Sequence, residues 1–266
     1  MSNPLKWHGG KSYLAKEIIA LMPPHVHYVE PFFGGGAVLF AKPHEGVSEV
    51  INDLDRRLTG FWTVLADKVM FEEFSRIIAA TPFSEIEWER SYSSEDFPGT
   101  VESAVDFFIR YRQSRQGLGD CFATLSRNRT RRGMNEQASA WWSAIEGLPE
   151  AHERLKRVVI LNDRACTVIK QQDGENTFFF CDPPYLHSTR VTKSNYKYEM
   201  SEAEHAGMLG VLSAIKGKFI LSGYRSELYD KVADAAGWNR VDIEIDNKAS
   251  SAETKPIKTE SLWMNY

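Results

Sequence analysis

Long apolar runs, paired cysteines and a large net charge are all missing from this 266-residue sequence. No apolar run approaches the roughly 20 residues that a membrane-spanning helix needs, and residues 1–7 lack the apolar stretch of a secretory signal. The three cysteines, Cys121, Cys166 and Cys181, are scattered and odd in number, so they fit neither a disulfide framework nor a zinc site. We therefore expect a protein of the reducing cytoplasm.

The net charge of −4 and a pI near 6.0 give no sign of a nucleic-acid partner by themselves. The charge is uneven, however, because residues 110–135 hold seven arginines against one acidic residue, Asp120. A surplus of six positive charges inside an acidic chain predicts a polarised molecule with one basic surface.

Several short apolar runs end in polar or small residues, which is typical of buried parallel strands that deliver side chains to a crevice. Helical patterns such as 14–22 and 202–215 separate the apolar runs 26–30, 49–51, 158–161, 178–181 and 218–221. Two further strands, 240–245 and 261–266, are expected to pair antiparallel around a polar loop, 246–260. The pattern predicts an α/β fold with an open, mostly parallel sheet, and in such sheets ligands bind outside the carboxyl ends of the strands.

Residues 57–156 interrupt the alternation of strands and helices. They are rich in arginine, aromatic and helix-favouring residues and carry few strand signals. We predict an inserted, largely helical domain at 57–156 and an α/β domain formed by 1–56 and 157–266.

The segment 28–37 predicts a strand, a glycine-rich turn at Gly34, Gly35 and Gly36, and then a helix. Asp53 follows Gly36 by 17 residues, close to the offset at which α/β nucleotide sites place a carboxylate on ribose hydroxyls. The alternative is a tight turn with no ligand, followed by an exposed strand-end acid. Neither the phosphate-binding loop of ATP sites nor the dinucleotide fingerprint of NAD sites is complete.

A loop at residues 6–11 combines glycines with Trp7 and Lys11. Tryptophan can face a sulfonium-type cation and lysine can pair with a carboxylate, and S-adenosylmethionine carries both groups. The alternative is that Trp7 simply packs on the core.

The segment Asp182-Pro183-Pro184-Tyr185 follows the apolar run 178–181. The prolines remove two N–H donors and leave carbonyl oxygens free to accept hydrogen bonds. The Asp182 carboxylate and the Pro183 carbonyl could together accept both N–H bonds of an aromatic amine, which would turn its lone pair toward an electrophilic methyl group. Tyr185 offers a ring on which the base could stack. The alternative is a structural Asp-Pro turn.

With these motifs in this order, the sequence resembles the Dam-like N6-adenine DNA methyltransferases, whose cofactor motifs come first and whose recognition domain precedes the catalytic motif. The resemblance implies a Rossmann-like, mostly parallel seven-stranded sheet with an inserted recognition domain, the use of S-adenosylmethionine, and no metal. It implies a catalytic role for Asp182, Pro183 and Tyr185. It implies cofactor contacts at Trp7, Lys11, Glu30, Pro31, Phe32, Gly34, Gly35, Gly36, Asp53, Asn162, Asp163 and Asp182. His8 departs from the alanine that is common in the family.

A methyl acceptor inside duplex DNA must be flipped out of the stack, at a cost of about a few kcal/mol that contacts elsewhere have to offset. The basic segment could supply these contacts, with arginines on phosphates and arginine or asparagine on base edges. The alternative is a solvated charged face. Residues 186–200 lack apolar periodicity, which predicts a mobile loop that orders on DNA or around the flipped base, with a plain surface loop as the alternative. The expected DNA contacts are Arg112, Arg115, Arg127, Asn128, Arg129, Arg131, Arg132, Arg190, Lys193 and Lys197.

The sequence thus predicts a site-specific adenine methyltransferase acting on double-stranded DNA, expected as a cytoplasmic monomer with no membrane contact. It would be solitary, phage-borne or paired with a restriction nuclease. Other interpretations keep the chemistry and change the acceptor to cytosine N4, RNA or a protein glutamine, or assume a DNA-binding relative without catalysis. Aspartate at position 182 favours adenine, because serine or asparagine there resembles the other branches.

Overall fold

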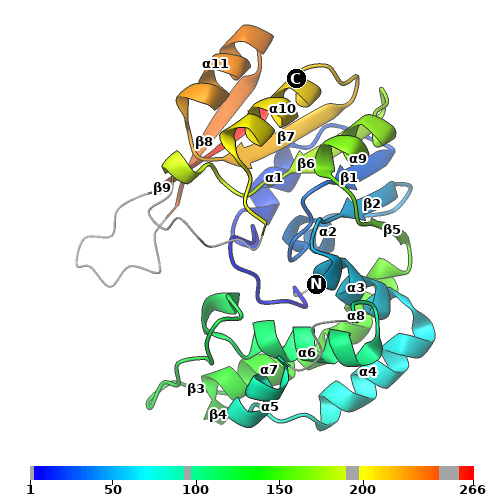
Figure 1. The fold of residues 1–266 in the computed structure, drawn as a ribbon, viewed down its shortest axis with the longest axis vertical. Helices are drawn as coiled ribbons and strands as arrows, with labels where there is room; N and C mark the ends of the chain where they lie inside the picture. Colours follow the sequence, from blue (N-terminus) through cyan, green and yellow to red (C-terminus); the bar gives the residue numbers. More distant parts are fainter. Residues whose placement is uncertain (1–2, 93–96, 190–197, 246–257) are drawn as a thin grey trace. The chain divides into compact units, whose positions relative to one another are not determined.

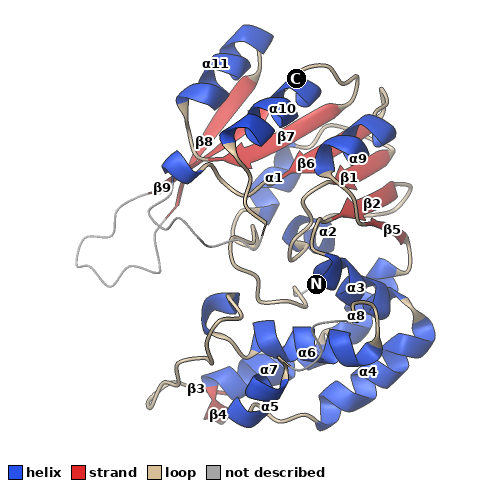
Figure 2. Cartoon of the chain, in the orientation of Figure 1, coloured by secondary structure: helices blue, strands red, loops and turns tan. Residues whose placement is uncertain are grey.

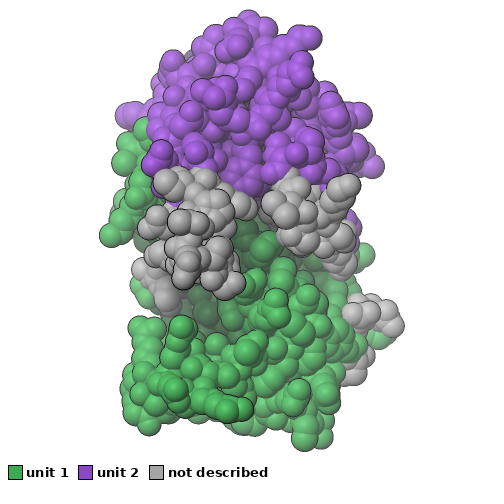
Figure 3. Space-filling model, turned by 90° about the vertical axis from the view of Figure 1, so that its left-hand side faces the viewer, with its two compact units in different colours: residues 1–21, 33–45, 55–162 green, residues 22–32, 46–54, 163–266 purple. Residues whose placement is uncertain are grey.

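The computed structural model describes residues 3–92, 97–189, 198–245 and 258–266 (Figure 1). Its internal contacts divide the chain into two compact units, which Figure 3 colours separately. Unit 1 comprises residues 1–21, 33–45 and 55–162, and unit 2 comprises residues 22–32, 46–54 and 163–266. This division follows contacts alone, and the assignment of 57–156 to target recognition stays a prediction.

Over the described residues, the main sheet has seven strands in the order β5-β2-β1-β6-β7-β9-β8. The strands are β1 (His27–Glu30), β2 (Ser48–Asn52), β5 (Val158–Leu161), β6 (Thr177–Cys181), β7 (Lys218–Gly223), β8 (Asn239–Ile245) and β9 (Lys258–Met264). β1 is parallel to β2 and β6, β6 is parallel to β7, and β9 runs antiparallel to both β7 and β8. The predicted fold class, a Rossmann-like sheet of seven mostly parallel strands, is confirmed.

The centre of unit 2 is the strand β6, in which every residue is buried. Its run of three phenylalanines shows no alternation, which is expected for a parallel strand covered on both faces. The helices α9 (Ala165–Gln172), α10 (Glu202–Leu212) and α11 (Glu227–Ala236) lie across one face of the sheet (Figures 1 and 2). α10 begins with a capping box in which Ser201 and Glu204 satisfy each other's backbone N–H groups.

The last strand begins earlier than the sequence predicts. We expected a strand from 261 and a polar loop up to Glu260, whereas β9 starts at Lys258 and pairs Glu260 with Ile243. Glu260 is fully buried. The prediction failed because a charged residue was interpreted as loop, although a buried carboxylate with hydroxyl donors beside it is compatible with a strand. Residues 246–257 of the predicted loop lie outside the described residues.

Unit 1 is mostly helical. Its helices are α1 (Ala15–Leu21), α2 (Ala37–Ala41), α3 (Arg56–Ala66), α4 (Lys68–Ala80), α5 (Glu85–Arg90), α6 (Val101–Arg112), α7 (Glu136–Glu146), α8 (Leu148–Leu155) and the short 3-10 turn η1 (Arg115–Gly117). A two-stranded hairpin joins β3 (Thr130–Arg131) to β4 (Met134–Asn135). α3 packs against α6 through buried aromatic rings, with Phe61 stacked on both Phe107 and Phe108. The expected helical character of 57–156 is therefore observed.

Candidate active site

Asn52, the last residue of β2, connects the ends of three strand segments in unit 2. Its amide nitrogen donates to the carbonyls of Pro31 and Asp163, each at 2.9 Å, and its amide oxygen accepts from the Asp163 N–H at 2.9 Å. The side chain is buried, so these three bonds fix the turn after β1 against the segment after β5. The sequence did not predict this anchoring role of Asn52.

The predicted cofactor residues of unit 2 gather around this amide. Asp53 directly follows Asn52 and is half-buried, and Asp163 is exposed, with its carboxylate accepting from the N–H of Arg164 at 2.6 Å. Glu30 is buried, and its carboxylate accepts from the hydroxyl of Tyr28 at 2.6 Å. Pro31 is buried and Phe32 half-buried. Because β1 and β2 are parallel, their carboxyl ends place these groups at one edge of the sheet.

The glycine-rich loop of unit 1 is shaped by Trp7. A Cβ added at Gly34 would lie 2.9 Å from the indole nitrogen, and one at Gly35 would lie 2.6 Å from the Trp7 Cβ. The indole also contacts the rings of Phe107 and Tyr111, with centroid distances of 6.2 and 4.9 Å. Close packing against Trp7 therefore requires glycine at both positions, whatever else the loop binds.

The other predicted cofactor residues of unit 1 are Lys11, Gly36 and Asn162. Lys11 is buried, and its ammonium donates to the carbonyl of Gly9 at 3.1 Å. Gly36 has a φ of 72° at the start of α2. Asn162 follows β5 and is exposed.

The N-terminal segment is tied to the loop that follows α6. Arg112 donates to the carbonyls of Pro4 and Asn3, both at 2.7 Å, and Lys6 donates to the carbonyl of Ser114 at 2.9 Å. Burial lowers the pKa of Arg112 to about 10, which keeps its guanidinium cationic at neutral pH. Burial and the neighbouring charge of Arg112 also lower the pKa of Lys6. Arg112, predicted as a DNA contact, thus has a structural role that sequence reasoning missed.

The predicted catalytic segment follows β6 in unit 2. Asp182 is half-buried, Pro183 is buried, and Tyr185 is 9% exposed. The Tyr185 hydroxyl donates to the carboxylate of Glu260, which also accepts from the Ser222 hydroxyl at 2.7 Å. Burial raises the pKa of Tyr185 well above its ordinary value, and the neighbouring charges of Asp182 and Glu260 add to the effect. The phenol is therefore a neutral donor at physiological pH.

The arginines of the basic segment fall into two groups. Three of them donate hydrogen bonds within unit 1: Arg110 donates to the carbonyl of Ser91, Arg112 holds the N-terminal segment, and Arg132 forms a two-bond ion pair with Glu146 at 2.8 and 2.9 Å. The second group consists of the exposed residues Arg115, Arg127, Arg129 and Arg131, and Asn128 in the same segment is also exposed. Arg132 is exposed as well, so the two groups differ in their hydrogen bonds and not in exposure alone.

An open cavity of about 740 Å³ lies beside the hairpin of unit 1. It is lined by Lys6, Arg112, Asn128, Arg129, Thr130, Arg131, Glu136, Gln137 and Ala140. Its acidic member, Glu136, lies 3.8 Å from the guanidinium of Arg129. The cavity is thus polar with a basic excess. The other predicted DNA contacts, Arg190, Lys193 and Lys197, lie outside the described residues.

The described residues contain neither a metal-binding cluster nor a membrane-spanning helix. No group of three or more histidine, cysteine, aspartate or glutamate side chains is placed to hold a metal ion in those ranges. None of the helices in the same ranges is long and apolar enough to cross a membrane.

Comparison with known proteins identifies the family. Residues 7–244 match the D12 class N6 adenine-specific DNA methyltransferase family. The Type II methyltransferase M.MjaIII of Methanocaldococcus jannaschii is 25% identical to this chain, with 98% of each chain covered. The Type II methyltransferase M1.LlaDCHI of Lactococcus lactis subsp. cremoris is 24% identical, with 98% of this chain and 94% of the relative covered.

The solved rRNA methyltransferase aviRa of Streptomyces viridochromogenes aligns over 99% of this chain and 89% of its own, with 15% identity and a TM-score of 0.40. A likeness at that level says nothing about the acceptor of this chain. The family match spans most of the sequence and confirms the adenine-methyltransferase resemblance at the level of the family. The chain belongs to the D12 class N6 adenine-specific DNA methyltransferase family.

Proposed function

We propose that this chain methylates the N6 amino group of a flipped-out adenine in double-stranded DNA, with S-adenosylmethionine as the donor. The single observation that carries the proposal is the segment Asp182–Tyr185, which leaves the central buried strand β6 at the carboxyl edge of a mostly parallel sheet. Ligands of such sheets bind at that edge. Family membership supports adenine as the acceptor.

The chemistry of the segment suits an aromatic amine. The lone pair of adenine N6 is delocalised into the ring, which makes the amine a poor nucleophile. The Asp182 carboxylate and the Pro183 carbonyl would each accept one N–H bond and hold the nitrogen in a pyramidal geometry, and the Tyr185 ring would stack on the base. The contribution of these residues is orientation and electrostatic stabilisation.

The residues at the strand ends fit the proposed cofactor. S-adenosylmethionine supplies an electrophilic methyl group on a sulfonium, and its ribose hydroxyls and amino groups need acceptors. Asp53 and Asp163 offer carboxylates beside the Asn52 amide, which fixes the backbone of both segments. Trp7, Lys11 and the glycine-rich loop remain proposed cofactor contacts on the sequence argument.

DNA binding is proposed for the exposed part of the basic segment. Arg129, Arg131 and Asn128 line the polar cavity beside the hairpin, and Arg115 and Arg127 are exposed in the same segment. Guanidinium groups neutralise phosphates, and arginine or asparagine can read base edges bidentately. This arrangement supports a Dam-like order of domains, with target recognition assigned to 57–156. Binding energy from these contacts would offset the cost of flipping the base.

The central test replaces Asp182 with alanine. Transfer of labelled methyl from S-adenosylmethionine to plasmid DNA prepared without adenine methylation should fall by roughly 100-fold or more, which is typical for the loss of a preorganised polar contact. Calorimetry should show cofactor and DNA binding largely intact. Asp234→Ala, which removes an exposed acid from α11, is the matched control and should keep full activity. Full activity of Asp182→Ala would refute the assigned role.

A restriction–modification role extends the proposal. Both relatives are named Type II methyltransferases, which supports pairing of this chain with a nuclease of the same specificity. Sequencing that detects methylated adenine in DNA from cells expressing the chain would identify the target site. Plasmids methylated at that site should then resist a nuclease that cuts there, and cleavage at the unmodified rate would contradict this extension.

A further inference from the structure

Glu260 is a fully buried carboxylate that the proposed chemistry does not use. It accepts the hydroxyl of Tyr185 and, at 2.7 Å, the hydroxyl of Ser222, which is also fully buried. Tyr185 and Ser222 lie 3.4 Å apart at their hydroxyl oxygens. Two hydroxyl donors on one buried carboxylate are short, charge-assisted contacts of the kind that fixes geometry.

These contacts restrict the Tyr185 ring at its far end. Pro183 and Pro184 fix the backbone that leads into the residue, because each proline holds its φ near −65°. The hydroxyl is held by Glu260, and the ring of Tyr224 packs edge-on at a centroid distance of 4.7 Å and an angle of 68°. The two prolines, the bond to Glu260 and the contact with the Tyr224 ring therefore together hold the Tyr185 ring in one orientation.

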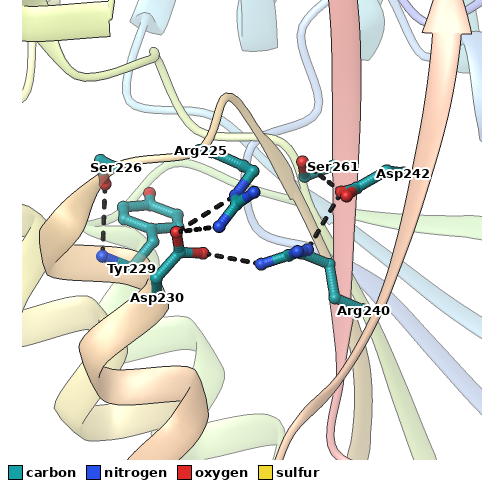
Figure 4. Close-up of polar contacts among 7 residues, drawn as sticks. All are labelled: Arg225, Ser226, Tyr229, Asp230, Arg240, Asp242 and Ser261. Carbon is teal, nitrogen blue, oxygen red and sulfur yellow. Dashed lines mark hydrogen bonds and ion pairs between the residues drawn. The ribbon is translucent and has the colours of Figure 1, made fainter.

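Ser261, the residue after Glu260, anchors the same strand through a second set of polar contacts (Figure 4). The Ser261 hydroxyl donates to Asp242 at 2.7 Å, and Arg240 lies 3.1 Å from Asp242 and 3.0 Å from Asp230. Asp230 in turn pairs with Arg225 at 2.9 Å. The side chains of the ion pairs are partly exposed, so each ion pair contributes little to stability, whereas Ser261 is fully buried. Together they join β9, β8, α11 and the loop after β7.

The two ends of this series of polar contacts, Ser261 and Arg225, are the sequence neighbours of the two residues that contact the Tyr185 side chain. Ser261 directly follows Glu260, and Arg225 directly follows Tyr224. The two residues that restrain the tyrosine therefore sit on backbone segments that the chain of ion pairs links together.

We propose that Glu260 is a positioning residue, which sets the tilt of the Tyr185 ring through its hydroxyl so that the ring can stack on the target adenine. The inference rests on the proposed function, because the stacking partner is the flipped base. Ser222 orients the carboxylate by donating to the same oxygen. Glu260 itself touches neither substrate nor cofactor in this proposal.

The test is a double-mutant cycle on kcat. Glu260→Met removes the acceptor at similar length, and Tyr185→Phe removes the hydroxyl and keeps the ring. Each should lower kcat by roughly 10- to 100-fold, the usual loss for a hydrogen bond to a charged group. The affinity for S-adenosylmethionine should change by less than about twofold. The double variant should be no slower than the slower single variant, because both changes remove one interaction.

Two further variants separate positioning from general stability. Glu260→Gln keeps an acceptor oxygen and should recover most of the activity that Glu260→Met loses. Glu244→Met makes the same change at an exposed residue of the same hairpin and should match the wild type. A positioning role predicts that glutamine at position 260 restores kcat, and that this recovery does not follow the melting temperatures of the variants.

Three outcomes would overturn the inference. The kcat of Tyr185→Phe or of Glu260→Met could lie within twofold of the wild-type kcat. Alternatively, the double variant could lose kcat by the product of the factors that the two single variants lose. If Glu260→Met does not fold, the other two variants still test the inference. The kcat of Tyr185→Phe must then be reduced, and the kcat of Glu260→Gln must be close to that of the wild type. A wild-type chain that transfers no methyl to adenine refutes the proposed function itself. Wild-type activity with insensitive variants refutes only the role of Glu260.

Discussion

Replacing Asn52 with alanine should both destabilise the protein and weaken cofactor binding. The change removes three hydrogen bonds of 2.9 Å from a side chain that is 1% exposed. At about 1 kcal/mol each, the loss is about 3 kcal/mol, and it rises toward 5 kcal/mol if the freed backbone groups stay without water. For a chain of this size the melting temperature should fall by roughly 6 to 12 °C.

The measurement is calorimetric unfolding together with titration of S-adenosylmethionine. Cofactor affinity should fall by about tenfold, because the segments that carry Asp53 and Asp163 lose their shared anchor. Asn239→Ala removes one exposed amide bond to the Tyr266 carbonyl and is the matched control, with an expected cost below about 1 kcal/mol. A melting temperature within about 2 °C of the wild type for Asn52→Ala would show that the amide does not hold the strand ends.

Two more predictions concern pH and salt. Burial raises the pKa of Tyr111 to about 12, so between pH 10 and 12 only the unfolded chain loses that proton and the free energy of unfolding falls by about 2 to 3 kcal/mol. Denaturant titrations should show Tyr111→Phe losing less stability across this interval, and identical slopes would contradict the shift. Replacing Arg127 and Arg129 with alanine should weaken DNA binding and reduce the salt slope by about 0.9 for each phosphate that is no longer neutralised. Arg132→Ala removes a residue that already donates two hydrogen bonds to Glu146, so it should leave the slope nearly unchanged. An equal effect of all three substitutions would contradict this distinction.

The sequence was informative where function depends on consecutive residues. The apolar run ending at Cys181 predicted the strand β6, and the four residues of the proposed site follow that strand directly along the chain. The alternation of strands and helices likewise predicted a mostly parallel sheet. Local patterns carry this information because backbone geometry is local.

Residues whose role depends on distant partners could not be predicted in this way. The Glu260–Tyr185 bond spans 75 positions, and the Asn52–Asp163 pair spans 111. A polar residue in a sequence predicts an exposed side chain on average. Only the fold shows that Glu260 and Asn52 are buried and hydrogen-bonded. For the same reason the sequence predicts Arg112 as part of a charged surface, since its acceptors lie 108 and 109 positions away.

The two hydrogen bonds by which Arg112 holds the N-terminal segment have an evolutionary consequence. Its guanidinium recognises the carbonyls of Asn3 and Pro4, which every amino acid provides. The side chain at position 4 can therefore change among homologues while the two hydrogen bonds persist, whereas the Asn3 side chain also accepts the N–H of Leu5 at 3.2 Å. Position 112 has no such freedom, because lysine lacks the planar fork that reaches two carbonyls at once. We expect a variable residue at position 4 opposite an invariant arginine, and the conservation of that arginine would otherwise be mistaken for DNA recognition.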